Sequence, residues 1–483
     1  MAELELIDVS LRDGNQSLWS GTGITTPHVL ELAPLLDRAG FRALDFTSST
    51  HMGISVRTHR EDPWERIRLT HAAMPNTRLQ FIGTGLRFIS WETVHPDFMQ
   101  LAYDRLVANG MSRFIVLDPM HDWDAMAETA RMLRRAGADE IVGALVYTIS
   151  PIHDDAFYVS LASRIADTRE FDRAYIKDPT GLLTPDRART LIPAVREALR
   201  GKPLELHSHT TIGLSPLTYL EGADLGVAAL HVACGPLANG SSLPSAQSVI
   251  ANLAERGHTV RIDMATLNKV ADHLHRVARA DGLPAGTPQE YDAAFLRHQL
   301  AGGTMSTTRR QLAEVGLEHR FDEVIDEVAR VRAELGYPIM VTPFPQMVVG
   351  QALANVSVAE RYANVSDQVI RYVLGRFGRP TAPVDPSVRE RILDRPRARQ
   401  LAEQPPPPEL FELRRRFPGV SDEEFLLRAT MPAEQVDAMV AAGPARRRRT
   451  PELQPLLALL EGLAERDCQQ VAIERPDFRL ELR

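Results

Sequence analysis

The chain has 483 residues, 44% of them hydrophobic, with a formal charge of −8. This length predicts a barrel-sized domain plus smaller units, and the acidic balance argues against nucleic acid or an anionic membrane as the main partner. Two cysteines cannot form a disulfide framework, the N-terminal residues do not form a signal peptide, and no run is long and apolar enough to span a membrane. We therefore expect a cytoplasmic protein without a membrane segment.

Eight short apolar runs alternate with helix-period segments in the first 260 residues. Capping signals mark the helices: Thr184 and Pro185 begin one of them and Gly201 follows it. The runs are 4–8, 43–46, 79–83, 113–118, 140–147, 173–178, 204–209 and 229–233. Eight such units in about 250 residues predict a parallel (β/α)8 TIM barrel.

Helical patterns dominate the rest of the chain. We expect a barrel over 1–260, a helical extension over 261–402 that completes the active-site funnel, and a proline-rich linker over 403–410. A small helical segment over 411–442 and a tail over 443–483 follow. The tail pattern predicts one helix and two strands, for a carrier-like or partner-docking segment.

Polar side chains follow several of the predicted strands. Asp8 ends the first, Lys177 the sixth, and His207 and His209 the seventh, where a spacing of two places both on one side of the strand. Because catalytic groups of such barrels gather at the carboxyl ends of the strands, we expect these four together. Each residue also has a structural interpretation, such as an ion-paired lysine or a capping aspartate. Their convergence favours a site for a divalent ion such as zinc or manganese.

Lys177 is one of only three lysines in the chain, which otherwise uses arginine for positive charge. An ammonium group would repel a metal ion, whereas a lysine carbamate formed with CO2 would supply an oxygen ligand. A lysine amine is able to react in this way and an arginine is not.

Several longer motifs resemble the carboxyltransferase domain shared by pyruvate carboxylase, the oxaloacetate decarboxylase alpha subunit and the transcarboxylase keto-acid subunit. They are "DVSLRDGNQSL", "EDPWER", "IKDPTGLLTP", "HSHTTIG", "SSLPS", "GGTMSTTRRQL", "VTPFPQMVVGQAL" and "SDEEFLLRATMP". Together they extend from residue 4 to about 440. The resemblance implies carboxyl transfer between carboxybiotin on a separate carrier and an enolate of a keto-acid-like acceptor.

The resemblance also implies roles for individual residues. Asp8, carbamylated Lys177, His207 and His209 match a metal site for Zn, Mn or Co, and Ser241 matches a threonine that passes a proton between biotin and the enol. Arg12 and Gln16 match residues that line the substrate pocket. The implied partners are a biotin carrier protein and a biotin carboxylase subunit, and the family tends to form homodimers.

Three positions depart from the family pattern. Where the family has E-M-W-G-G-A-T, this sequence has "DFTSSTH", which introduces His51. The family's arginine that clamps the keto-acid carboxylate aligns with Thr84, and the family's aspartate after H-x-H aligns with Thr210. Threonine cannot replace a bidentate arginine. Arg87 or Arg57 are candidates to take its place. With Thr84 and His51 they form the expected substrate-binding set, and we expect an acceptor other than pyruvate.

Two alternatives use the same residues. Metal-dependent lyases and aldolases similar to hydroxymethylglutaryl-CoA lyase also carry an R-D-G-x-Q motif and an H-x-H pair, without biotin. An assembly scaffold with a decayed pocket is a non-enzymatic alternative. The motifs "IKDPTGLLTP" and "EDPWER" favour the carboxyltransferase.

Overall fold

The structure is a computed structural model. It describes residues 3–90, 92–300, 302–314, 316, 318–378, 380–445, 471–475 and 478–482. The chain forms two compact units, Met1–Pro444 and Ala445–Arg483, and each is described here by itself.

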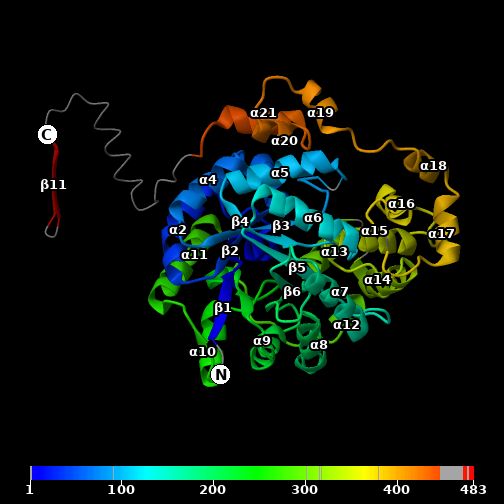
Figure 1. The fold of residues 1–483 in the computed structure, drawn as a ribbon, viewed down its shortest axis with the longest axis horizontal. Coiled ribbons are helices and arrows are strands. Elements are labelled where there is room, and N and C mark those ends of the chain that lie inside the picture. The colour runs from blue at the N-terminus through cyan, green and yellow to red at the C-terminus, as the bar shows by residue number, and fades with distance from the viewer. Residues whose placement is uncertain are drawn as a thin grey trace. The chain divides into compact units, whose positions relative to one another are not determined.

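Eight parallel strands close into a barrel at the centre of the first unit (Figure 1). The strands are β1 (Glu3–Asp8), β2 (Ala43–Ser48), β3 (Arg78–Gly83), β4 (Met111–Val116), β5 (Glu140–Val146), β6 (Arg173–Asp178), β7 (Leu204–Ser208) and β8 (Ala229–Val232). Each strand pairs with the next along the chain, and β8 pairs with β1 to close the barrel. A two-residue strand, β9 (Thr259–Val260), adds to the start of β1. The predicted (β/α)8 barrel is confirmed.

Helices surround the strands. They are α2 (Thr26–Ala39), α4 (Pro63–Ala73), α5 (Pro96–Ala108), α6 (Trp123–Ala136), α7 (Asp155–Asp167), α8 (Pro185–Ala198), α9 (Ser215–Asp224), α10 (Ala246–Glu255) and α11 (Met264–Asp281). The predicted cap of α8 forms, since the Thr184 side chain accepts a hydrogen bond from the backbone of Arg187 and Pro185 begins the helix. Short helical segments lie in the loops: η1 (Ser10–Gly14), α1 (Asn15–Trp19), α3 (Ser49–Ile54), η2 (Ser55–His59) and η3 (Gly235–Leu237).

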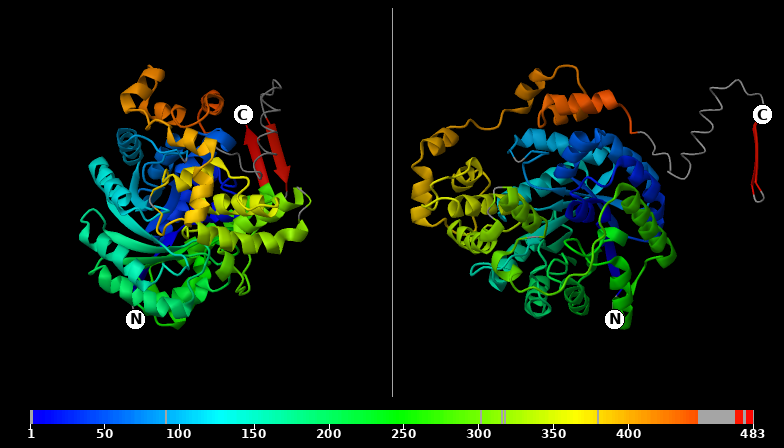
Figure 2. Two further views of the ribbon diagram at one scale, coloured as in Figure 1. Left: turned by 90° about the vertical axis from the view of Figure 1, so that its right-hand side faces the viewer. Right: turned by 180° about the vertical axis from the view of Figure 1, so that it is seen from behind.

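The C-terminal part of the first unit is helical, as predicted. Its helices are α12 (Phe295–His298), α13 (Gly302–Glu314), η4 (Glu318–Arg320), α14 (Phe321–Glu334), α15 (Phe344–Val356), α16 (Asp367–Val373), α17 (Pro386–Leu393), α18 (Pro396–Ala402), α19 (Leu410–Arg416), α20 (Asp422–Arg428) and α21 (Ala433–Ala442). Helices α14 to α18 form a lobe beside the barrel, and α19 to α21 return to the side of α4 and α5 (Figures 1 and 2). The indole of Trp64 in α4 donates to the carbonyl of Glu423 there, at 3.1 Å. The domain divisions expected at 260 and 402 stay predictions, because both lie within one compact unit.

Strand side chains alternate between the barrel interior and the helical layer, which decides which residues reach the site. In β1, Leu4 and Leu6 pack in the large core under the helices, whereas Ile7 packs in a small cluster inside the barrel. In β6, Ile176 faces the helices and Tyr175 faces inward. Even-numbered residues of β1 therefore face the helical layer, and odd-numbered residues of β6 face the barrel interior.

In the second unit, β10 (Val471–Arg475) and β11 (Phe478–Leu482) form an antiparallel pair. The two strands predicted for the tail are present, and the helix predicted before them lies outside the described residues. None of the described helices combines the length and the apolar character needed to cross a membrane.

Candidate active site

A cavity of about 520 Å³ opens where the strands end and is bounded on the other side by the C-terminal helices. The barrel contributes Arg12, Asp13, Gln16, Lys177, His209 and Ser241, among others, and α13, α15 and the segment before α15 contribute Thr304, Thr308, Met340, Thr342, Gln346 and Val349, among others. This is the position at which (β/α)8 barrels place their catalytic groups. The helical region thus supplies part of the cavity wall.

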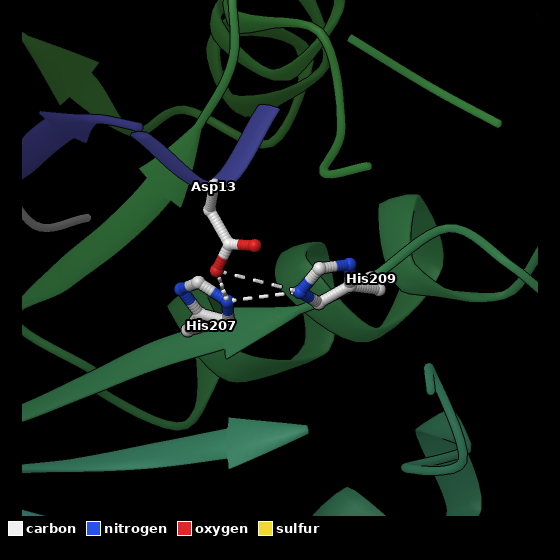
Figure 3. A group of neighbouring side chains, drawn as sticks. All are labelled: Asp13, His207 and His209. Carbon is white, nitrogen blue, oxygen red and sulfur yellow. Dashed lines mark hydrogen bonds and ion pairs between the residues drawn. The ribbon is translucent and has the colours of Figure 1, made fainter. Parts of the chain in front are cut away.

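Asp13, His207 and His209 lie together (Figure 3), and Asp13 and His209 belong to the cavity wall. The Nε2 atoms of the two histidines are 3.2 Å apart, and Asp13 Oδ2 lies 3.2 Å from that of His207 and 3.6 Å from that of His209. Lys177 Nζ lies 3.0 Å from the same Asp13 oxygen and 3.1 Å from His207 Nε2. All four side chains are buried. Four polar groups therefore converge on one point.

The predicted set of four residues is corrected at one position: Asp13, not Asp8, meets Lys177 and the histidines. Asp8 shares the outward face of β1 with Leu4 and Leu6, and its carboxylate accepts hydrogen bonds from Ser10 N, at 3.1 Å, and Ser10 Oγ, at 2.7 Å. Its other partner is the thiol of Cys234. The chain turns back over the mouth in η1, and that turn brings Asp13 to the cluster.

Burial and charge keep the cluster in defined protonation states. Although burial favours the neutral acid, the adjacent positive charges of Arg12 and Lys177 hold the pKa of Asp13 well below its usual value. Burial, followed by the charge of Lys177, lowers the pKa of His207 strongly. Burial also lowers the pKa of Lys177, and Asp13 partly opposes this. The site thus combines a carboxylate, a neutral imidazole and a readily deprotonated lysine.

Arg12 lies on the cavity wall, as predicted, but its charge is shared with two acids. Its Nε donates to Asp45 Oδ2 at 2.8 Å, and its Nη2 lies 2.9 Å from Asp13. Asp45 extends inward from β2 and was not among the predicted residues. No spacing in the sequence links it to Arg12, because the pairing joins the η1 turn to strand β2.

Ser241 and Gln16 both line the cavity. Ser241 Oγ donates to the carbonyl of Ser17 at 2.8 Å, and the Ser241 carbonyl lies 2.7 Å from His209 Nδ1. The neighbouring Ser242 is fully buried and its hydroxyl is not part of the cavity wall. Of the two adjacent serines, the structure therefore places Ser241 at the site.

Only one of the four residues predicted to bind substrate lines the cavity, and it is Thr84. Arg87 is buried and donates to the carbonyl of Phe377 at 3.2 Å, which attaches the β3 loop to the C-terminal region. Arg57 is exposed in η2. His51 is buried, with Nδ1 3.1 Å from Ser48 Oγ, and burial followed by the charge of Arg12 lowers its pKa to about 3. Neither arginine takes the place of a clamp at Thr84.

The donor cluster fits a divalent metal ion. Bonds of about 2.0–2.1 Å at tetrahedral or octahedral angles place neighbouring donors about 2.8–3.4 Å apart, a range that includes the 3.2 Å between the two imidazoles. The hydrogen bond between His209 Nδ1 and the Ser241 carbonyl requires a proton on that nitrogen and leaves Nε2 free as a ligand. Asp13, His207 and His209 would hold the ion, and a carbamylated Lys177 would supply a further oxygen.

The fold and this site together define a (β/α)8-barrel enzyme with a carboxylate, histidine and lysine centre at the carboxyl ends of its strands. A family model described as a conserved carboxylase domain matches residues 295–472. A subunit of pyruvate carboxylase from Methanocaldococcus jannaschii is 34% identical over 392 residues, which are 81% of this chain and 68% of that protein.

Two further relatives come from different systems. The 2-oxoglutarate carboxylase large subunit of Hydrogenobacter thermophilus is 30% identical over 90% of this chain and 68% of its own length. The methylmalonyl-CoA carboxyltransferase 5S subunit of Propionibacterium freudenreichii is 30% identical over 80% of this chain and 76% of its own. The chain belongs to this family, the carboxyltransferase subunits of biotin-dependent carboxylases.

A solved structure has the same fold. The carboxyl transferase domain of Rhizobium etli pyruvate carboxylase, determined with oxamate and biotin, matches 91% of this chain and 78% of its own with a TM-score of 0.82 and 23% identity. The predicted family and enzyme class are confirmed, and the relatives named above all come from carboxylase or carboxyltransferase systems, not from lyases.

Proposed function

We propose that the cavity binds biotin from a partner subunit together with a carbonyl acceptor, and that the carboxyl group passes between them above Lys177. The observation that carries this proposal is the convergence of Asp13, Lys177, His207 and His209 at a cavity that also presents Ser241. In the carboxylation direction, the bond between biotin nitrogen and the carboxyl carbon breaks. A bond forms between that carbon and the acceptor, and the acceptor's proton moves to the biotin nitrogen.

A divalent ion, when bound, would withdraw electrons from the acceptor carbonyl and so acidify the adjacent carbon. Asp13, His207 and His209 would hold that ion. Lys177 would join them as a carbamate: its ammonium group loses one proton to give the neutral amine, the amine adds to CO2, and loss of a second proton leaves a negatively charged carbamate. Burial of the lysine favours the neutral amine that this reaction needs.

Ser241 carries the proton between the acceptor and biotin. Its hydroxyl lies on the cavity wall, and the carbonyl of Ser17 accepts its hydrogen bond. A hydroxyl both donates and accepts, so it is able to receive one proton while it releases another. Arg12 and Gln16 line the adjacent wall and orient the bound groups.

The acceptor is a carbonyl compound other than pyruvate. The wall around Thr84 presents hydroxyl groups, from Ser48, Thr50 and Ser90, and among the described residues the guanidinium on this wall is that of Arg12, which Asp13 and Asp45 neutralise. A small keto acid would find no bidentate partner for its carboxylate there. The cavity has room for an acceptor with a longer polar or apolar substituent.

None of the lysines in residues 1–483 is placed to carry the biotin. Lys177, Lys202 and Lys269 are the only lysines, and none lies in the M-K-M setting of a carrier domain. Lys202 donates to three backbone carbonyls at 2.7–2.8 Å, a structural arrangement. The implied partners are a biotin carrier protein and a biotin carboxylase subunit, with the 443–483 tail as a docking segment. The homodimer and the cytoplasmic location stay predictions.

The test is carboxyl transfer, measured as release of CO2 from a panel of carboxylated keto acids and acyl-CoA compounds. Each is incubated with and without free biotin or a biotinylated carrier, for the wild type and for Lys177→Ala. We expect release that requires biotin and Lys177. Release without biotin would contradict the proposal and indicate a lyase. No release from any compound of the panel would favour an acceptor outside the panel or a scaffold.

A further inference from the structure

A chain of side chains connects His207 to the interior of the barrel. His207 Nδ1 lies 3.1 Å from His231 Nδ1, and His231 Nε2 lies 3.0 Å from Glu205 Oε2. All three residues are buried, with relative exposures of 0–1%. His231 extends inward from β8 and Glu205 from β7, two residues before His207. Behind the predicted metal ligand His207 there is therefore a second layer of hydrogen-bonded residues, His231 and Glu205.

Two arginines hold Glu205 as a carboxylate. Arg113 Nη2 lies 2.6 Å from Oε2, and Arg173 Nε lies 2.6 Å from Oε1. Although burial opposes the charge of Glu205, Arg113 is the largest of the influences that lower its pKa far below its usual value. Tyr175 stacks on His231 with ring centroids 5.4 Å apart and 19° between the planes. The carboxylate and the ring thus have fixed positions.

This arrangement determines where each proton lies. A carboxylate accepts only, so His231 must donate from Nε2, and in a neutral imidazole the other nitrogen is then an acceptor. His207 must therefore carry its proton on Nδ1 and donate it to His231. The remaining nitrogen of His207, Nε2, keeps its lone pair and points at Asp13 Oδ2 and His209.

We propose that His231 and Glu205 are positioning residues that hold His207 in the tautomer and orientation required to bind the metal ion. His231 does not line the cavity, so it acts through His207. Partners of this kind contribute about 10–100-fold to metal affinity. The inference rests on the ion of the proposed function, but not on the identity of the acceptor.

Metal binding by His231 variants tests the proposal. His231→Leu fills the space without an acceptor, and His231→Asn restores one, because the Asn carbonyl oxygen takes the place of Nδ1. The control is His258→Asn: His258 is also buried and paired with a carboxylate, Asp224 at 2.9 Å, but lies in the connection between α10 and β9. Affinity for Zn²⁺ and Mn²⁺ is measured by chelator competition on purified protein without biotin or acceptor, together with the melting temperature of each metal-free variant.

We expect His231→Leu to weaken metal affinity about 10–100-fold, His231→Asn to regain most of it, and the control to match the wild type. In metal-free protein with ¹⁵N-labelled histidine, the His207 Nδ1–H signal should persist in His231→Asn and disappear in His231→Leu. Wild-type affinity in His231→Leu, or equal losses in both variants, would overturn the inference. Because the assay contains only metal, it separates this result from a failure of carboxyl transfer.

Discussion

Replacing Asp13 with Asn tests the corrected site most directly, with Asp8→Asn as the matched control. Asp13 supplies the anionic oxygen that lies 3.2 Å and 3.6 Å from the two imidazole nitrogens. Its loss removes one ligand and one of the negative charges that would offset the charge of the ion. A residue that only supports a ligand contributes about 10–100-fold, or roughly 1.4–2.7 kcal/mol, so removal of the ligand itself should cost more than 100-fold in affinity.

The assay is chelator competition with Zn²⁺ or Mn²⁺, followed by carboxyl transfer with the acceptor that the panel identifies. Asp8→Asn should keep wild-type metal affinity, because the Asp8 carboxylate faces Ser10 and Cys234 and not the cluster. Wild-type affinity in Asp13→Asn would refute this reasoning. An equal loss in both variants would refute it as well, since it would return Asp8 to the ligand set.

Four further outcomes follow from the same geometry. Burial raises the pKa of Asp8 to about 6 from 3.8, so the folded state binds this proton more tightly. Asp8 therefore contributes its full stabilisation below pH 4, and this contribution is lost as the pH rises through 6. The change amounts to about 3 kcal/mol in the free energy of unfolding. Denaturant titrations of Asp8→Asn should not show it. Thr84→Arg should shift the acceptor preference toward small 2-keto acids, measured as a ratio of kcat/KM values; an unchanged ratio would contradict the role given to this wall. Ser241→Ala should lower kcat for transfer about 100-fold or more with metal affinity unchanged, whereas Ser242→Ala, at a buried hydroxyl outside the cavity, should not. Lys177→Ala should lose metal and activity, and full metal content in that variant would exclude the carbamate.

The sequence was sufficient to predict the barrel because each strand and helix carries local signals. The histidine pair was also predictable, since a spacing of two in a strand always returns to the same face. The same alternation could have identified the error at Asp8, because the apolar residues Leu4 and Leu6 share its face. Asp13 lies in a turn beyond the strand, where no periodicity applies.

Contacts between segments that lie far apart in the chain could not be predicted in this way. The pairs Arg12–Asp45 and His207–His231 join residues that lie 33 and 24 positions apart in the chain. Which of them meet depends on the register and closure of the barrel. Arg87 illustrates the converse: its charge suggested substrate binding, and the carbonyl of Phe377, almost 300 residues later, accepts its hydrogen bond instead.

Ion pairs between strands in the barrel interior fix the position of the metal ligand His207. Glu205 lies between Arg113 and Arg173, and Arg113 also pairs with Glu140, so each buried charge is opposed by a neighbour on a different strand. Removing one member of such a network leaves an unpaired buried charge, which costs about 3–5 kcal/mol. A slip of one residue in β7 would turn Glu205 and His207 outward together. The ion pairs that fix the register of this strand therefore also fix the metal ligand two residues further along it.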